Sequence, residues 1–211
     1  MNRESDYLRG LVPESEEFIR NMEEYAEENR IPIMEKESMH FLKQLLHIKK
    51  CATVLEIGTA IGYSAIEMAH AHPEIHIVSI ERDRQRYEEA MNNKMNSDVS
   101  ERLTFHYGDA LEMEEELGEF GPFDVLFIDA AKGQYRRFFE LYAPLLTDDG
   151  IIISDNVLFK GLVANPDTED KRMVKIADKI RTFNEWLTQL EDYDTSILPI
   201  GDGVALTTKR M

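Results

Sequence analysis

The chain has 211 residues, of which 43% are hydrophobic, and its formal net charge is −17. This length and composition predict one globular domain over residues 1–211 and exclude intrinsic disorder. The negative charge argues against a protein that coats nucleic acid, so no DNA partner is expected. A single cysteine excludes a disulfide framework. The N-terminus lacks the apolar core of a signal peptide and no run approaches the roughly 18 apolar residues of a membrane span, so we expect a cytoplasmic protein without a membrane partner.

The first fifty residues contain two helical patterns, about 14–30 and 35–48, which are separated at Pro32. From residue 51 onward, short apolar runs alternate with amphipathic stretches. The expected strands are 53–57, 76–80, 103–106, 124–128 and 151–154, and the expected helices are 61–71, 83–96, 110–118, 133–146 and about 170–190. This alternation predicts a parallel sheet covered by helices on both faces. Two further strands, 195–199 and 203–208, flank a glycine turn and predict a closing hairpin, so that the sheet has seven strands and an antiparallel last strand.

A turn rich in small residues follows strand 53–57 and contains Gly58 and Gly62. Such a turn before a helix lets backbone N–H groups approach a ligand closely, although glycine turns also join strands to helices for steric reasons alone. Glu81 lies 19 residues after Gly62, at the end of the next strand, where a carboxylate can accept both hydroxyls of a ribose. The pair of features favours a nucleoside-type cofactor.

Two residues help to identify that cofactor. Ala60 stands where the dinucleotide fingerprint has its second glycine, which disfavours NAD. Asp109 follows strand 103–106 and is placed to meet an adenine amino group, although a residue before 110–118 also fits a helix N-cap. S-adenosylmethionine is therefore favoured over NAD.

Three polar residues follow two apolar runs that are distant in sequence. Asp129 comes after strand 124–128, and Asp155 and Asn156 follow strand 151–154. Because the carboxyl ends of parallel strands meet at one edge of a sheet, these side chains can converge. Two carboxylates and an amide oxygen are hard ligands that suit Mg²⁺ or a similar ion. The alternative is that the aspartates cap helices and Asn156 is a turn residue.

Several motifs together resemble a known family. They are 56–59 (EIGT), 62–64 (GYS), 128–132 (IDAAK), 154–157 (SDNV) and 201–203 (GDG). Over nearly the whole chain these resemble the cation-dependent class I O-methyltransferases of the catechol and caffeoyl-CoA type. Within that family, 31–36 (IPIMEK), 130–135 (AAKGQY) and 156–163 (NVLFKGLV) resemble the bacterial tRNA 5-hydroxyuridine methyltransferases. The resemblance implies a class I methyltransferase (Rossmann-like) fold, N-terminal helices in 1–50 that cap the site, and a homodimer.

The resemblance also implies roles for individual residues. Asp129, Asp155 and Asn156 would hold Mg²⁺ or another hard divalent cation. The residues implied to line the S-adenosylmethionine site are Met34, Ser64, Glu81, Asp109, Ala110 and Asp129, and Glu56 and Gly58 are implied to bind the cofactor from the loop beneath it.

Lys132 and Asp129 are the candidate catalytic residues. Lys132 lies three residues after Asp129 and can accept a proton or place its ammonium beside the forming oxyanion, unless it is a solvated surface lysine. A divalent cation bound to a hydroxyl lowers its pKa and orients it, most effectively when a second oxygen lies beside the first. Catechols have this pair of oxygens, and so does 5-hydroxyuridine.

The charge is unevenly distributed along the chain. Residues 156–184 contain six Lys and Arg against four Asp and Glu, a net charge of +2, so the remaining residues carry −19. This stretch predicts a local surface for the phosphates of a tRNA anticodon loop, although a solvated helix gives the same pattern. The candidate RNA contacts are Tyr135, Arg136, Lys160, Arg172 and Lys175, and Phe159 is a second aromatic residue that could stack on a base. Tyr135 and Phe159 lie near helix starts, where an aromatic residue can equally be a packing residue.

The function expected from these features is methylation of 5-hydroxyuridine at the tRNA wobble position to 5-methoxyuridine. One alternative is an O-methyltransferase of small catechol-like phenols. A second alternative is a cofactor-binding protein without catalysis, which the complete set of Asp129, Asp155 and Asn156 disfavours.

Overall fold

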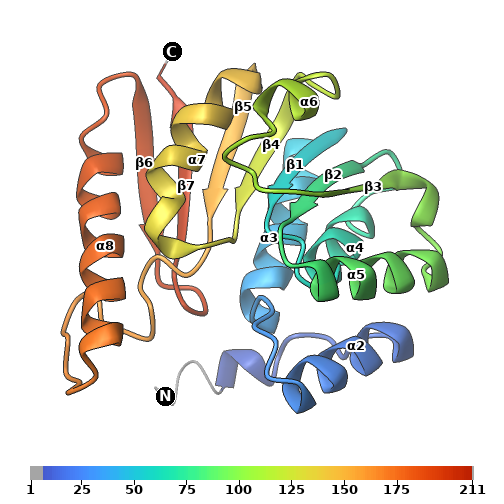
Figure 1. Cartoon of the computed structure of the whole chain (residues 1–211), viewed down its shortest axis with the longest axis horizontal. Coiled ribbons are helices and arrows are strands. Elements are labelled where there is room, and N and C mark those ends of the chain that lie inside the picture. Colours follow the sequence, from blue (N-terminus) through green and yellow to red (C-terminus); the bar gives the residue numbers. More distant parts are fainter. Residues whose placement is uncertain (1–6, 211) are drawn as a thin grey trace.

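A computed structural model describes residues 7–210, which contain one seven-stranded sheet (Figure 1). The strands are β1 Thr53–Ile57, β2 His76–Glu81, β3 Leu103–Tyr107, β4 Phe123–Ile128, β5 Leu146–Ser154, β6 Tyr193–Leu198 and β7 Val204–Lys209. Their order in the sheet is β3-β2-β1-β4-β5-β7-β6. The pairs from β3 to β5 are parallel, and β7 lies antiparallel between β5 and β6. The predicted parallel sheet with an antiparallel last strand is confirmed.

The helices lie close to their predicted positions. They are α2 Glu17–Glu28, α3 Lys36–Lys49, α4 Tyr63–Ala69, α5 Arg84–Asn96, α6 Glu114–Gly118, α7 Tyr135–Tyr142 and α8 Lys171–Thr188, with the short turns η1 Ser100–Arg102, η2 Lys132–Gln134 and η3 Ala143–Leu145. The helix expected over 133–146 ends at Tyr142, since Pro144 in η3 has no N–H to continue an α-helix. In the described part of the chain, no helix is long and apolar enough to cross a bilayer.

Helices cover both faces of the sheet because the strands are apolar on both sides. Val54, Val125 and Ile153 point to one face and pack with α2, α3, α4 and α5. Their neighbours Leu55 and Leu126 point to the opposite face and pack with α6, α7 and α8. In Figure 1, α8 flanks the β6 end of the sheet and α5 flanks the β3 end. Two cores therefore fix the sheet between two helical layers.

The carboxyl edge of the sheet positions the loops that carry polar residues. The ladder of hydrogen bonds continues past the strand ends, since Gly58 N donates to Ile80 O at 3.0 Å and Asp129 N donates to Ile57 O at 3.0 Å. Asp155 N donates to Ile128 O at 3.1 Å. Strand order reverses between β1 and β4, and a ligand cleft is expected at such a reversal in an open α/β sheet.

Candidate active site

A cavity of about 310 Å³ opens at this reversal of strand order. Seven of the residues singled out in the sequence line it: Gly58, Glu81, Asp109, Ala110, Asp129, Lys132 and Asn156. They come from loops after five different strands, so the carboxyl edge of the sheet brings them together as predicted. Pro32, Ile33 and Phe138 also line the cavity and were not anticipated.

The turn after β1 forms one wall of the cavity. Its Gly58 has φ +110°, and a Cβ there would collide with the carbonyl oxygen of Asp129. Ala60 also has a positive φ, of 47°, and its N–H donates to Glu81 Oε2 at 2.9 Å. Glu81 Oε1 accepts from Asp83 N at 2.8 Å, so both carboxylate oxygens are held by backbone. The lone pairs that remain on Glu81 are available to the hydroxyls of a ribose.

Replacing Gly58 by alanine is expected to destabilise the protein and to weaken cofactor binding. The new methyl group would force the glycine turn away from β4, and overpacking of this kind costs about 1–3 kcal/mol of unfolding free energy. Gly161→Ala is the matched control, because Gly161 also has a positive φ of +77° but has no atom within 4 Å of the added Cβ. Urea denaturation measures the difference, and equal losses in the two variants would contradict the steric account.

A buried polar network supports the turn from beneath. Glu56 is fully buried, its Oε1 accepts from Ser64 Oγ at 2.5 Å, and its Oε2 accepts from Ser79 Oγ. Thr59 Oγ1 is 2.6 Å from Ser79 Oγ. Burial raises the pKa of Glu56 to about 7, although the two serine hydrogen bonds lower it. Glu56 lies beneath the site, as expected, whereas Ser64 was expected to line the site and instead lies outside the lining of the cavity.

This raised pKa gives a testable pH dependence. Between the ordinary value of 4.5 and the folded value of about 7, the folded protein keeps a proton that the unfolded chain has lost. Glu56 therefore lowers the free energy of unfolding as pH rises through this window, by about 3 kcal/mol in total. Glu56→Gln should remove that slope, so the variant should gain stability relative to the parent between pH 5 and pH 8. Guanidinium denaturation at pH 5 and at pH 8 checks this. The same difference in unfolding free energy between variant and parent at both pH values would contradict it.

Asp109 and Ala110 form the wall opposite the glycine turn. Asp109 Oδ1 accepts from Leu111 N at 3.0 Å, and Tyr142 OH donates to Ala110 O at 2.5 Å. The alternative interpretation of Asp109 as a helix N-cap is wrong, because α6 begins only at Glu114. Residues 110–113 instead form a turn that is held by the Asp109 side chain, and this turn replaces the first part of the helix expected over 110–118.

The candidate metal ligands lie together with Lys132. Lys132 Nζ donates to Asn156 Oδ1 at 2.6 Å, and Asn156 Nδ2 donates to Asp155 Oδ2 at 3.2 Å. Asp155 is 1% exposed. Burial raises the pKa of Asp129, which the Lys132 ammonium opposes. Burial, followed by the Asp129 carboxylate, raises the pKa of Asp155 well above its usual range. The carboxylates of Asp129, which is partly buried, and of Asp155, which is fully buried, therefore lie near one ammonium.

This arrangement fits a divalent cation. Asp155 Oδ1 is buried and has no hydrogen-bond partner, and an unsatisfied buried carboxylate oxygen is costly. Within residues 7–210, no group of three or more His, Cys, Asp and Glu side chains could hold a metal ion, so the centre depends on the amide oxygen of Asn156. A hard cation would satisfy Asp155 Oδ1 and balance the two carboxylates.

Met34 does not line the cofactor cavity. It is 3% exposed and borders a separate cavity beside Tyr63. Pro32 and Ile33, two residues and one residue earlier, line that cavity instead. The sequence indicated the correct segment. Because residues 31–35 form neither helix nor strand, no helical or strand periodicity indicates which of their side chains point inward.

The prediction that Tyr135 stacks on a base is wrong. Tyr135 is 1% exposed, its ring packs edge-to-face on Phe183 with centroids 5.4 Å apart, and its OH donates to Asp155 O at 3.0 Å. It therefore supports the loop of Asp155 and Asn156 from the inside. Phe159 is also buried, at 7% exposed, and belongs to the apolar core.

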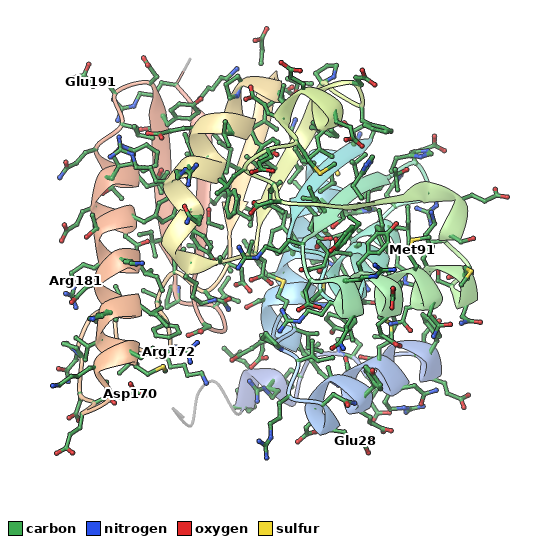
Figure 2. All side chains as sticks on the ribbon, viewed as in Figure 1. Glu28, Met91, Asp170, Arg172, Arg181 and Glu191 are labelled. Atoms are coloured by element: carbon green, nitrogen blue, oxygen red, sulfur yellow. The ribbon has the colours of Figure 1, made fainter. Side chains whose placement is uncertain are left out.

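The cationic candidates lie on α7, on α8 and in the loop after β5. One groove is lined by Lys132, Arg136 and Lys179, and a second by Lys171, Arg172, Lys175 and Lys179, so that Lys179 belongs to both. Arg136 is bound to Glu140 at 2.7 Å and lies over the Trp186 ring, whereas Arg172 lies in the first turn of α8 (Figure 2). Lys160 is exposed in the loop after β5, and its N–H donates to Asp202. Because Lys179 lines both grooves, together they run from Lys132 to the cationic side chains of α8.

The fold and the site define a class I methyltransferase. The structure matches a Staphylococcus aureus protein assigned as a caffeoyl-CoA O-methyltransferase with a TM-score of 0.93 and 34% identity, over 99% of this chain and 100% of that chain. It also matches TomG from Streptomyces achromogenes, an O-methyltransferase of tomaymycin synthesis in complex with S-adenosylmethionine, with a TM-score of 0.83 and 26% identity over 100% and 97% of the two chains.

The sequence comparisons identify the family. The model of the O-methyltransferase family matches residues 11–210. Caffeoyl-CoA O-methyltransferase 1 from Eucalyptus globulus is 31% identical over 172 residues, which cover 79% of this chain and 70% of that enzyme. A flavonoid 3′,5′-methyltransferase from Vitis vinifera is 30% identical over 173 residues, covering 79% and 74%. The chain belongs to the O-methyltransferase family and is an S-adenosylmethionine-dependent O-methyltransferase of the caffeoyl-CoA type.

Proposed function

We propose that this chain transfers the methyl group of S-adenosylmethionine, with the help of a divalent cation, to one hydroxyl of an acceptor that presents two neighbouring oxygens. The observation that carries the proposal is the convergence of Asp129, Asn156 and Lys132 in the lining of the cavity, with Asp155 bonded to Asn156 behind it. The unsatisfied Asp155 Oδ1 supports a cation at this position.

The cavity wall supports the binding of S-adenosylmethionine. Glu81 would accept the ribose hydroxyls, and Asp109 would meet the adenine amino group across the cavity. Gly58 lets the chain pass close to the cofactor because it has no side chain. The cofactor supplies an electrophilic methyl group on a sulfonium, and the protein must bring an acceptor oxygen into line with it.

Transfer forms one O–C bond and breaks one C–S bond, and the acceptor hydroxyl must lose its proton. A divalent cation held by Asp129, Asp155 and Asn156 would bind the acceptor oxygens and lower the pKa of the hydroxyl. Lys132 lines the same cavity and its Nζ lies 2.6 Å from Asn156 Oδ1, so its side chain would lie near an acceptor oxygen bound to that cation. There it can receive the proton or stabilise the oxyanion that develops.

A catechol-like phenol is the acceptor that the relatives support. The curated relatives are named as methyltransferases of caffeoyl-CoA and of flavonoid 3′,5′ positions, and all the named acceptors are phenols. Adjacent phenolic oxygens would satisfy the geometry of the candidate metal centre without further contacts on the protein surface.

A 5-hydroxyuridine in a tRNA anticodon loop is the second candidate acceptor, and a specific surface feature favours it. Lys171, Lys175 and Lys179 are spaced four residues apart and therefore lie on one face of α8, where like charges destabilise a helix unless an anion is bound. This row spans about 12 Å, enough for two phosphates, and leads through Lys179 to Lys132. The tRNA partner and the homodimer remain predictions.

One experiment tests both acceptors. The purified protein, S-adenosylmethionine and Mg²⁺ are incubated with a simple catechol and with tRNA that carries 5-hydroxyuridine, and methyl transfer to each is measured. Turnover of either acceptor supports the proposed chemistry and identifies the substrate. Absence of transfer to both would contradict the proposed function.

Charge reversal on α8 separates the two acceptors further. Lys175→Glu is expected to raise the KM for tRNA about tenfold at low salt, because phosphate contacts dominate RNA affinity. The KM for catechol should not change. Equal effects on both acceptors, or none on tRNA, would exclude this helix as the RNA-binding surface.

A further inference from the structure

One irregular segment of the N-terminal part of the chain forms a wall of the cofactor cavity. Residues 31–35, here called the strap, connect α2 to α3 without helix or strand. Pro32 and Ile33 face the cofactor cavity, while Ile33 and Met34 also border a second cavity of about 280 Å³. Met34 packs the strap into the apolar core, but the two cavities leave Pro32 and Ile33 with fewer neighbours, so polar contacts at its ends also help to fix its position.

Glu23 of α2 provides such contacts. Its Oε1 accepts from Ser15 Oγ at 2.8 Å and from Tyr63 OH at 3.2 Å, and its Oε2 lies 2.6 Å from Lys36 Nζ. The Glu23 side chain is only 12% exposed. A shielded carboxylate with three donors is a strong and well-oriented acceptor.

Two of the residues that contact Glu23 lie at the starts of helices that follow walls of the cavity. Lys36 is the first residue of α3, directly after the strap. Tyr63 is the first residue of α4, directly after Gly62 of the glycine turn, and is 3% exposed. One carboxylate therefore fixes the distance between the strap and the glycine turn, which form neighbouring walls of the cofactor cavity.

We propose that Glu23 is a positioning residue for the cofactor: it fastens the strap to the start of α4 and so holds the cavity in the shape that binds S-adenosylmethionine. Glu23 does not line this cavity itself and acts through Lys36 and Tyr63. The inference rests on the assignment of this cavity as the cofactor site.

The test measures cofactor affinity separately from catalysis. Glu23→Ala is expected to raise the Kd for S-adenosylmethionine about tenfold by isothermal titration calorimetry, since it removes three hydrogen bonds to a charged group. The KM for the cofactor should rise in parallel, whereas kcat at saturating cofactor and the KM for the acceptor should not change. Glu24→Ala is the matched control, because Glu24 is the next residue on α2 and is exposed.

Two milder variants separate positioning from simple loss of structure. Tyr63→Phe and Lys36→Met each remove one partner of Glu23 and should each raise the Kd about threefold. Glu23→Gln keeps an oxygen acceptor and should lie between the parent and Glu23→Ala. The role of Glu23 would be overturned if folded Tyr63→Phe and Lys36→Met bound S-adenosylmethionine as tightly as the parent. It would also be overturned if kcat of Glu23→Ala fell by the same factor as its KM for the cofactor rose. If the parent protein itself does not bind S-adenosylmethionine, the assignment of the cofactor site fails and the role of Glu23 fails with it.

Discussion

Asp155→Asn is expected to lower the rate of methyl transfer about 1000-fold, because a divalent cation that binds and polarises an acceptor oxygen contributes several kcal/mol to the transition state. The substitution keeps the size of the side chain and removes the buried carboxylate that accepts from Asn156 Nδ2. Steady-state turnover with saturating acceptor measures the loss. Turnover within tenfold of the parent would contradict the metal assignment.

The same substitution should have the opposite effect on stability. Asp155 is 1% exposed and its Oδ1 has no hydrogen-bond partner, so in chelator the parent protein carries an unsatisfied buried carboxylate. Asp155→Asn should therefore raise the free energy of unfolding in chelator by about 1–3 kcal/mol. Chemical denaturation in EDTA checks this. A parallel loss of activity and stability would mean that Asp155 has a structural role instead.

Lys132→Met is expected to lower kcat about 100-fold or more, the usual contribution of a positioned proton acceptor or of one electrostatic stabiliser. Its ammonium is the group that donates to Asn156 Oδ1 at 2.6 Å and that lowers the pKa of Asp129. Methionine keeps the length of the side chain but not its charge. The affinity for S-adenosylmethionine should change little.

The pH dependence of kcat distinguishes the two roles of Lys132. Loss of one ionisation from the profile in Lys132→Met indicates proton transfer, whereas a uniformly lower profile indicates electrostatic stabilisation. Lys50→Met is the control, because Lys50 is exposed at the C-terminal end of α3. Unchanged kcat in Lys132→Met would contradict both roles.

The sheet was predictable because its pattern is local. The run 53–57 is apolar and is followed by a glycine turn, and β1 has these same bounds. Parallel pairing then places the ends of β1, β4 and β5 together, so Gly58, Asp129 and Asp155 meet at one edge although they are far apart in sequence. Residues that follow strands directly were therefore placed correctly by topology alone.

The orientation of side chains on short or irregular segments was less predictable. Tyr135 points inward because α8 supplies Phe183 as its partner, and nothing within residues 130–142 reveals that contact. The helix-cap alternative for Asp109 failed because its side chain closes a turn and α6 begins only five residues later. The orientation of side chains in the strap was equally hard to predict. Ile33 lines the cofactor cavity, whereas its neighbour Met34 borders only the second cavity. Such features depend on tertiary contacts that are distant in sequence.

The most direct test of the account is the metal dependence of the parent enzyme with whichever acceptor it methylates. The protein is dialysed against EDTA, methyl transfer from S-adenosylmethionine is measured, and Mg²⁺ is then restored in increasing amounts. If a divalent cation is required, transfer by the parent stops in chelator and returns with Mg²⁺. Transfer by Asp155→Asn is not restored by Mg²⁺. Undiminished transfer in chelator would contradict the proposed role of Asp129, Asp155 and Asn156.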